Sequence, residues 1–241
     1  MQPSPQADTK DAARDALDAA RKTLNGIILG KDTEVALALS CLLARGHLLI
    51  EDLPGLGKTT LAQSLARVLG LRFKRIQFTS DLLPADIVGV SVFRQQSGDV
   101  EFQPGPIGAE LILADEVNRA TPKAQSALLE AMEEHQVSVD GSTRDLPEPF
   151  FVVATQNPAD QIGTFPLPES QLDRFLMRIE LGYPDENSER ELITGQDRRQ
   201  MLESSVAVAN PAMLLALQKA VTGIRMNDPL VDYIQALVRF S

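Results

Sequence analysis

The stretch EDLPGLGKTT, residues 51–60, decides how the rest of the chain is interpreted. Two glycines, a lysine and two threonines follow an apolar run, in the order that a phosphate-binding loop requires. The glycines let backbone N–H groups turn toward phosphate oxygens, and the next helix adds the positive end of its dipole. Asp52, however, stands where the pattern G-x-x-x-x-G-K-S/T has its first glycine. The loop is therefore either a nucleotide site with a tolerated substitution or a chance resemblance.

The segments around this loop predict a strand before it and a helix after it, which is the context the motif needs. HLLIE (47–51) is short and apolar, and KTTLAQSLARVLG (58–70) repeats leucine every four residues. Four further strands are expected in FKRIQF (73–78), ELILA (110–114), FFVVA (150–154) and MRIEL (177–181). Strands separated by helices predict an α/β fold, with a central parallel five-stranded sheet between two helical layers.

Two segments interrupt this alternation and predict β-hairpin insertions. VSVFRQQSGDVEFQPGPIG (90–108) alternates around Ser97-Gly98, and HQVSVDGSTRDL (135–146) alternates around Asp140-Gly141. Near the start, residues 1–8 predict a flexible tail and residues 11–24 an amphipathic helix. KDTEVALALSCLLARG (31–46) predicts a second helix, with Asp32 or Thr33 as its N-cap. After Pro184 the pattern is helical only, so we expect a core domain over 9–184 and a second part over 185–241.

Composition excludes several classes of protein. The 241 residues include 33 acidic and 23 basic side chains, a formal charge of -10 that disfavours nucleic acid as a partner. Cys41 is the single cysteine and lies in an apolar run, which predicts a buried thiol and a reducing compartment. The sequence has only two histidines in addition to this cysteine, too few ligands for a cysteine/histidine zinc site. The polar start and the absence of a long apolar run predict a cytoplasmic protein with no membrane span.

A nucleotide hydrolase needs a second, acidic element at the end of a neighbouring strand, and LILADE (111–116) provides it. Asp115 is expected to hold Mg²⁺ together with the hydroxyl of Thr59. Glu116 is expected to polarise the attacking water, a role for a carboxylate outside the first shell of the metal. In the loop itself, Lys58 is a point charge for the β- and γ-phosphates, and Thr60 lies in the first helical turn.

At this point the chain resembles the MoxR family of AAA+ ATPases. The resemblance covers roughly residues 25–185 and also includes LADEVNRATPKAQSALLEAMEE (113–134), VVATQNP (152–158) and PLPESQLDRF (166–175). It implies an AAA+ P-loop three-layer αβα domain with a partial all-α lid, ATP and Mg²⁺ as cofactors, and a homo-oligomer in the form of a hexameric ring. Such rings remodel or mature other proteins, often partners with a von Willebrand factor A domain.

The loop of this family tends to read E-D-x-P-G-x-G-K, so an aspartate at the position of Asp52 is usual in the family. A carboxylate beside a triphosphate would be repelled. We therefore expect the Asp52 side chain to turn away from the phosphates and to bond the backbone or a neighbouring basic group.

The resemblance also implies roles for residues outside the two motifs. Asn157 resembles sensor 1, which bonds the γ-phosphate and the attacking water, and Arg174 resembles an arginine finger that reaches the adjacent subunit. Arg119 is a weaker interface candidate. The family places its sensor 2 arginine in a later helix than any in this chain, so neither Arg225 nor Arg239 is assigned. The expected nucleotide contacts are Pro54, Gly55, Leu56, Gly57, Lys58, Thr59 and Thr60 for the phosphates, and Ile28, Leu29, Gly30 and Tyr183 for the adenine.

Three functions remain open from the sequence. The first is an ATP-driven remodeller whose hairpins contact a client, with Phe93, Phe102 and the Pro104-Gly105-Pro106 turn as candidates. The second is a nucleic-acid motor, because minichromosome-maintenance helicases share both hairpin insertions. The third is a nucleotide-gated binding module that hydrolyses nothing, against which Glu116 argues.

Overall fold

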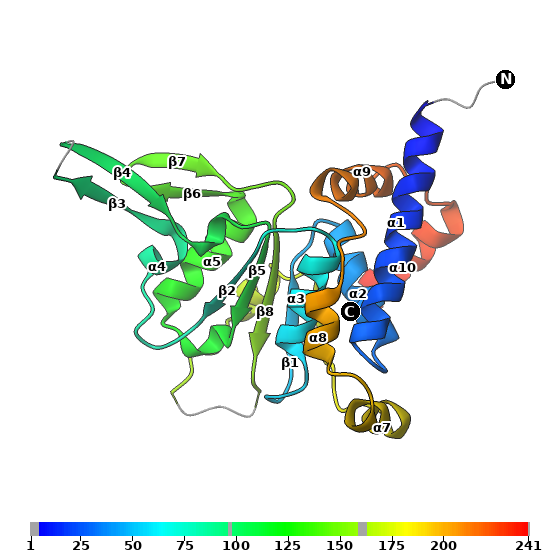
Figure 1. Ribbon diagram of the computed structural model, residues 1–241. Helices are drawn as coiled ribbons and strands as arrows, with labels where there is room; N and C mark the ends of the chain where they lie inside the picture. The colour runs from blue at the N-terminus through cyan, green and yellow to red at the C-terminus, as the bar shows by residue number, and fades with distance from the viewer. Residues whose placement is uncertain (1–4, 96–97, 159–162, 241) are drawn as a thin grey trace.

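The structure, a computed structural model, describes residues 5–95, 98–158 and 163–240. A five-stranded sheet forms its centre, in the order β2-β5-β8-β1-β9 (Figure 1). The strands are β1 (Leu48–Glu51), β2 (Phe73–Gln77), β5 (Leu111–Asp115), β8 (Phe151–Gln156) and β9 (Met177–Ile179). Every pairing between them is parallel. The parallel five-stranded sheet expected from the sequence is therefore confirmed, and all five carboxyl ends lie at one edge.

Helices cover both faces of this sheet because its strands alternate apolar side chains between two cores. Leu48 and Ile50 belong to one core cluster and Leu49 to the other. The first cluster includes residues of α1 (Pro5–Ile27), α2 (Asp32–Leu43) and α3 (Lys58–Val68). The second includes residues of α4 (Pro84–Val88) and α5 (Pro122–Glu134). Burial on both faces explains why the strands read as continuous apolar runs.

Both expected hairpins are present and project from the same side of the molecule (Figure 1). The first joins β3 (Gly89–Arg94) to β4 (Asp99–Pro104), and the second joins β6 (Gln136–Val139) to β7 (Ser142–Asp145). Asp140 and Gly141 take φ angles of 51° and 76°, the left-handed pair that a two-residue hairpin turn requires. Ser97, in the other turn, lies outside the described residues. The hairpins also touch, since the Arg144 guanidinium carbon lies 4.1 Å from the centre of the Phe102 ring.

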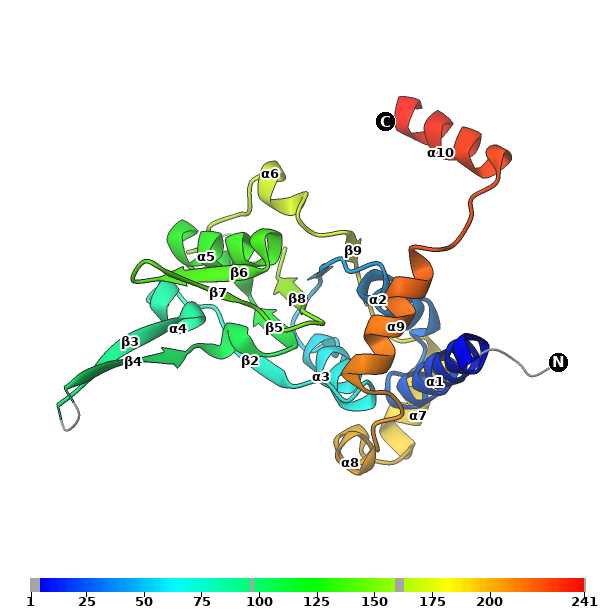
Figure 2. The same ribbon diagram turned by 90° about the horizontal axis from the view of Figure 1, so that it is seen from above.

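The residues after Pro184 are helical, as expected. Their helices, called the lid below, are α7 (Glu186–Thr194), α8 (Arg198–Ser204), α9 (Pro211–Val221) and α10 (Asp228–Phe240). Helix α9 packs on the core through the buried Leu214 and Gln218. Helix α10 extends away from the rest of the molecule (Figure 2) and buries none of its residues. The remaining turns of helix are α6 (Glu169–Leu172) and 3₁₀ turns at Pro106–Gly108 and Val117–Arg119.

Three local expectations need correction. Helix α1 begins at Pro5, so residues 5–8 of the expected tail are helical; residues 1–4 lie outside the described part. The N-cap of α2 is Lys31, because the Asp32 carboxylate instead accepts a hydrogen bond from the Asn25 amide. The Asp228-Pro229 pair predicts Asp228 as the N-cap of α10, but the cap is Asn227, whose side chain accepts the Leu230 N–H at 3.1 Å. In the described ranges, no helix has the length and apolar character needed to cross a membrane.

Candidate active site

The loop after β1 has the backbone shape that its glycines predict. Gly55 and Gly57 take φ angles of 86° and 87°, a conformation that residues with a side chain rarely adopt. Gly57 is also the N-cap of α3 and provides no side-chain bond to the helix. The first N–H groups of α3 therefore face the loop together with the positive end of the helix dipole, an arrangement suited to an anion.

Lys58 spans this loop. Its ammonium donates to the backbone carbonyls of Asp52 and Leu53, each at 2.6 Å. Burial lowers the pKa of Lys58, while the negative charges of Asp52, Asp115 and Glu116 act to raise it. Lys58 thus lies between the loop carbonyls and the acidic end of the neighbouring strand.

Asp52 bonds the backbone, as expected, and not the interior of the loop. One carboxylate oxygen accepts the N–H of Leu53 at 2.8 Å, and the other accepts the N–H of Gly182 at 2.6 Å. Gly182 lies 130 residues further on, just before the lid. The Lys31 ammonium binds the next carbonyl, that of Tyr183, at 2.9 Å. The residue that breaks the phosphate-loop pattern therefore ties the loop to the segment at Gly182 that joins the core to the lid, called the hinge below.

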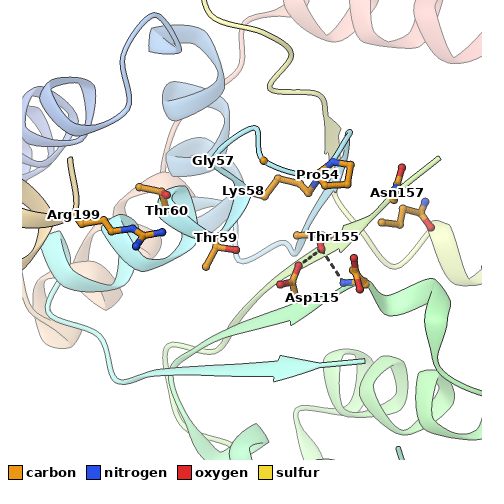
Figure 3. Close-up of a pocket in the computed structure, with 12 residues that line it drawn as sticks. Pro54, Gly57, Lys58, Thr59, Thr60, Asp115, Thr155, Asn157 and Arg199 are labelled. Atoms are coloured by element: carbon orange, nitrogen blue, oxygen red, sulfur yellow. Dashed lines mark hydrogen bonds between the residues drawn. The ribbon is translucent and has the colours of Figure 1, made fainter. Parts of the chain in front are cut away.

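The acidic pair follows β5 at the same edge of the sheet. Asp115 ends the strand, and Glu116 takes a left-handed φ of 58° that turns its side chain away from the strand. The buried Thr155 hydroxyl joins the two residues: it donates to an Asp115 oxygen at 2.6 Å and accepts the Glu116 N–H at 2.9 Å (Figure 3). This hydroxyl therefore holds the Asp115 carboxylate and the backbone of Glu116 in a fixed relation to each other.

Strand β2 adds two polar side chains to the pair. Arg75 binds the second Asp115 oxygen through Nε at 3.0 Å and through a terminal nitrogen at 2.5 Å. The Gln77 amide donates to Glu116 at 3.0 Å, and Arg119 pairs with the same carboxylate oxygen at 3.2 Å. Each acidic side chain is thus held by a neighbouring strand or turn.

One cavity of about 310 Å³ brings these elements together. Its lining residues are Pro54, Gly55, Gly57, Lys58, Thr59, Thr60, Asp115, Glu116, Thr155, Gln156, Asn157 and Arg199 (Figure 3). Thr59 and Asp115 offer oxygen donors, and Mg²⁺ commonly joins one or two such ligands to substrate phosphates. In the described ranges, no group of three or more His, Cys, Asp or Glu is arranged to hold a metal. The site therefore fits a magnesium ion that is held partly by phosphate oxygens.

A second, less polar cavity of about 200 Å³ adjoins the first. Ile28 and Leu29 line it as expected, together with Ile27, Lys31, Gly55, Leu56, Gly57, Thr60, Gly182, Pro184, Leu192 and Arg198. Its apolar walls suit a planar base. Gly30 and Tyr183 are not among these residues. Tyr183 is 74% exposed. Gly30, at a φ of 66°, lets the chain pass close to Ser188 of α7.

Comparison with known proteins agrees with this geometry. The sequence profile of the ATPase family associated with various cellular activities (AAA) matches residues 47–177. The uncharacterized protein YeaC of Bacillus subtilis is 47% identical over 223 residues, which are 92% of this chain and 70% of YeaC. Chaperone MoxR1 of Mycobacterium tuberculosis is 44% identical over 217 residues, 88% of this chain and 56% of MoxR1.

This chain belongs to the MoxR family of AAA+ ATPases.

A crystal structure of a presumed ATPase from Cytophaga hutchinsonii has the same fold, with a TM-score of 0.84 and 37% sequence identity. It covers 96% of this chain, and this chain covers 70% of it. The two proteins thus share the AAA+ fold over nearly all of this chain. The chain spans little more than half of the length of MoxR1.

Arg174 is the one expected catalytic residue that lies outside the nucleotide cavity. It follows α6 and donates to the Leu129 carbonyl of α5 at 2.8 Å, and it forms an ion pair with Glu133. It lines a separate surface hollow with Ser126, Glu130 and Gln171. The chain therefore brings Lys58, Thr59, Asp115, Glu116 and Asn157 together and holds Arg174 elsewhere.

Sequence reasoning missed Thr155, Arg75, Gln77 and Arg199. The first three are ordinary strand residues in the sequence, and the sheet order alone places them beside the acidic pair. A polar residue at the carboxyl end of a strand was the available signal for Thr155 and Gln77, as it was for Asn157. Arg199 belongs to a lid helix, and no pattern in the sequence around it indicates a nucleotide contact.

Proposed function

We propose that this chain is an ATP-hydrolysing subunit of a ring that remodels other proteins. One observation carries the proposal: the loop lysine, the acidic pair and the strand-end Asn157 line one cavity at the carboxyl edge of a parallel sheet. Open α/β sheets bind ligands at this edge. The adjoining apolar cavity provides space for the adenine.

The proposed reaction is attack of water on the γ-phosphorus of ATP, which gives ADP and phosphate. Lys58 and the N–H groups of the loop neutralise charge on the β- and γ-phosphates, and Asn157 orients the attacking water. Glu116 accepts the proton of that water, since its carboxylate lies beyond the residues that would hold the metal. Magnesium, held by Thr59, Asp115 and phosphate oxygens, would supply further neutralisation of phosphate charge.

Phosphate release by wild type and by Glu116→Gln tests this reaction. General-base catalysis contributes about 10²–10⁴-fold, so the variant should lose at least about 100-fold in rate while it still binds ATP. Lys58→Ala should lose nucleotide binding as well. Equal phosphate release by wild type and Glu116→Gln would favour the nucleotide-gated binding module instead.

We further propose that the active form is a hexameric ring in which Arg174 acts on the nucleotide of the adjacent subunit. Its ion pair with Glu133 lies at the surface, with 33% of the Arg174 side chain and 57% of the Glu133 side chain exposed. Surface pairs contribute only about 0–1 kcal/mol, so a phosphate could replace the carboxylate. The rate per subunit should rise with protein concentration and should stay low in Arg174→Ala. A rate that is independent of concentration and unchanged in Arg174→Ala would remove the ring mechanism.

The charge and packing of the hairpins favour a protein client over nucleic acid. The segments 89–104 and 135–146 contain two arginines, Arg94 and Arg144, against four acidic residues. Arg94 pairs with Glu101, and Arg144 lies over Phe102, so both basic groups are already engaged. Phe93 is exposed at the tip and offers an apolar contact. A partner with a von Willebrand factor A domain is the proposed client, and salt-dependent binding of single-stranded DNA would contradict this assignment.

A further inference from the structure

Two consecutive arginines at the start of lid helix α8 face the two halves of the nucleotide cavity. Arg198 lines the apolar cavity, and Arg199 lines the cavity that contains Lys58. Neither residue belongs to the motifs that identified the family, and neither Arg225 nor Arg239 lines either cavity.

Arg198 holds the start of α8 against the core. Its side chain is only 15% exposed, and its terminal nitrogens donate to the Gly26 carbonyl at 3.0 Å and to Glu191 of α7 at 2.9 Å. Its Nε is buried and has no hydrogen-bond partner among the described residues. The other end of α8 is also held, because Arg67 of α3 donates to the carbonyls of Glu203 and Ser205. The helix is therefore fixed to α3, which carries the phosphate-binding lysine.

Arg199 is the next residue, and this anchoring determines where it points. Its backbone N–H donates to the capping carboxylate of Asp197 at 2.8 Å. Its exposed guanidinium points toward Thr59 and Thr60 (Figure 3). Thr60, Gly55 and Gly57 line both cavities. Arg199 thus lies near the junction, where the phosphate chain of a nucleotide would pass from the base to Lys58.

Arg199 adds a second cationic side chain to the lining of the phosphate cavity. Lys58 and Arg199 are its two cationic lining residues, against the carboxylates of Asp115 and Glu116. Because Asp115 pairs with Arg75 and Glu116 with Arg119, the positive charges of Lys58 and Arg199 are available to a polyanion. A guanidinium is also suited to phosphate, because its fixed fork of donors matches two phosphate oxygens.

We propose that Arg199 binds the phosphates nearest the ribose, and that Arg198 positions α8 for this contact. The inference rests on the proposed function, since it requires a nucleotide in the two cavities. The contact falls on the part that ATP and ADP share, away from Glu116. Arg199 therefore determines how tightly both nucleotides are retained, and not the cleavage step.

The test is equilibrium binding of a fluorescent ADP and of non-hydrolysable ATP to the full chain, with Mg²⁺ present. Arg199→Ala should weaken both nucleotides by about tenfold, the value of one hydrogen-bonded charge contact. Arg199→Lys should recover part of this loss. Arg190→Ala is the matched control, because Arg190 is an exposed lid arginine that lines neither cavity, and it should bind like wild type.

The outcomes separate this inference from the proposed function. Binding by Arg199→Ala within twofold of wild type would overturn the inference and leave the proposed function intact. A loss for the ATP analogue alone would also overturn it, because the contact would then be with the γ-phosphate. Failure of wild type to bind either nucleotide would overturn the proposed function and this inference with it.

Discussion

Removal of the Asp52 carboxylate should loosen the hinge of the lid. The residue joins the phosphate-binding loop to Gly182 through a hydrogen bond of 2.6 Å, and it also accepts the neighbouring Leu53 N–H. Asp52→Ala deletes both acceptors. Asp52→Gly also deletes them, but it restores the glycine of the general phosphate-loop pattern. Comparison of the two variants therefore separates the effect of that glycine from the effect of the lost bond to Gly182.

The two bonds differ in what they contribute. The Leu53 bond is local and exposed, so water can replace it at little cost. The Gly182 bond is partly buried, spans 130 residues and has a charged acceptor, and such bonds contribute about 1.5–3 kcal/mol. We therefore expect Asp52→Ala to lower the free energy of unfolding by about 2 kcal/mol. Asp52→Asn keeps an acceptor oxygen and should lose about half of that.

Two measurements check this magnitude. Urea denaturation gives the change in free energy of unfolding, and hydrogen exchange at the Gly182 amide reports the bond itself. Asp18→Ala, on an exposed face of α1, removes the same charge and should leave both unchanged. Exchange at Gly182 that is equally slow in wild type and Asp52→Ala would refute the reasoning, whatever the change in global stability.

Three other predictions concern buried polar groups. Burial lowers the pKa of His47 to about 4, and its Nδ1 accepts the Val152 N–H. Below about pH 6.5 the unfolded chain binds more protons at His47 than the folded chain does, so the free energy of unfolding should fall by about 2 kcal/mol from pH 7 to pH 5. Urea titrations at several pH values should show a smaller pH dependence in His47→Gln. Burial raises the pKa of the Cys41 thiol to about 12, so a disulfide reagent at pH 8 should react only after unfolding; immediate reaction would contradict the burial. The buried Gln125 amide donates to three backbone carbonyls around the turn after Glu116. Gln125→Leu should therefore lower the free energy of unfolding by about 2 kcal/mol. Ser126→Ala, at an exposed position, should change it by less than about 0.5 kcal/mol.

The local features of the site could be predicted because they are properties of short segments. Gly55 and Gly57 are needed for left-handed φ angles, and an apolar run that ends in Asp115 and Glu116 marks the carboxyl end of a strand. The same local reasoning placed both hairpins. It failed at the cap of α2, where Asp32 bonds a residue of the preceding helix, a contact between elements that no pattern within 31–46 contains.

Features that depend on the order of strands and on the position of the lid could not be predicted in this way. Gln77 lies beside Asp115 only because β2 pairs with β5, and sequence spacing does not give that pairing. Thr155 reads as one more strand residue until β8 is placed next to β5. Arg199 reaches the phosphate cavity because Arg67 and Arg198 dock α8 on the core. Long-range packing decides these positions.

The most direct test of the central claim is a crystal structure of the Glu116→Gln protein with ATP and Mg²⁺. The triphosphate should lie against Lys58 and the N–H groups of residues 55–60, with the metal on Thr59 and Asp115. The Asp52 oxygens should remain on Gly182. A triphosphate bound elsewhere, or Asp52 oxygens in contact with phosphate, would contradict the claim.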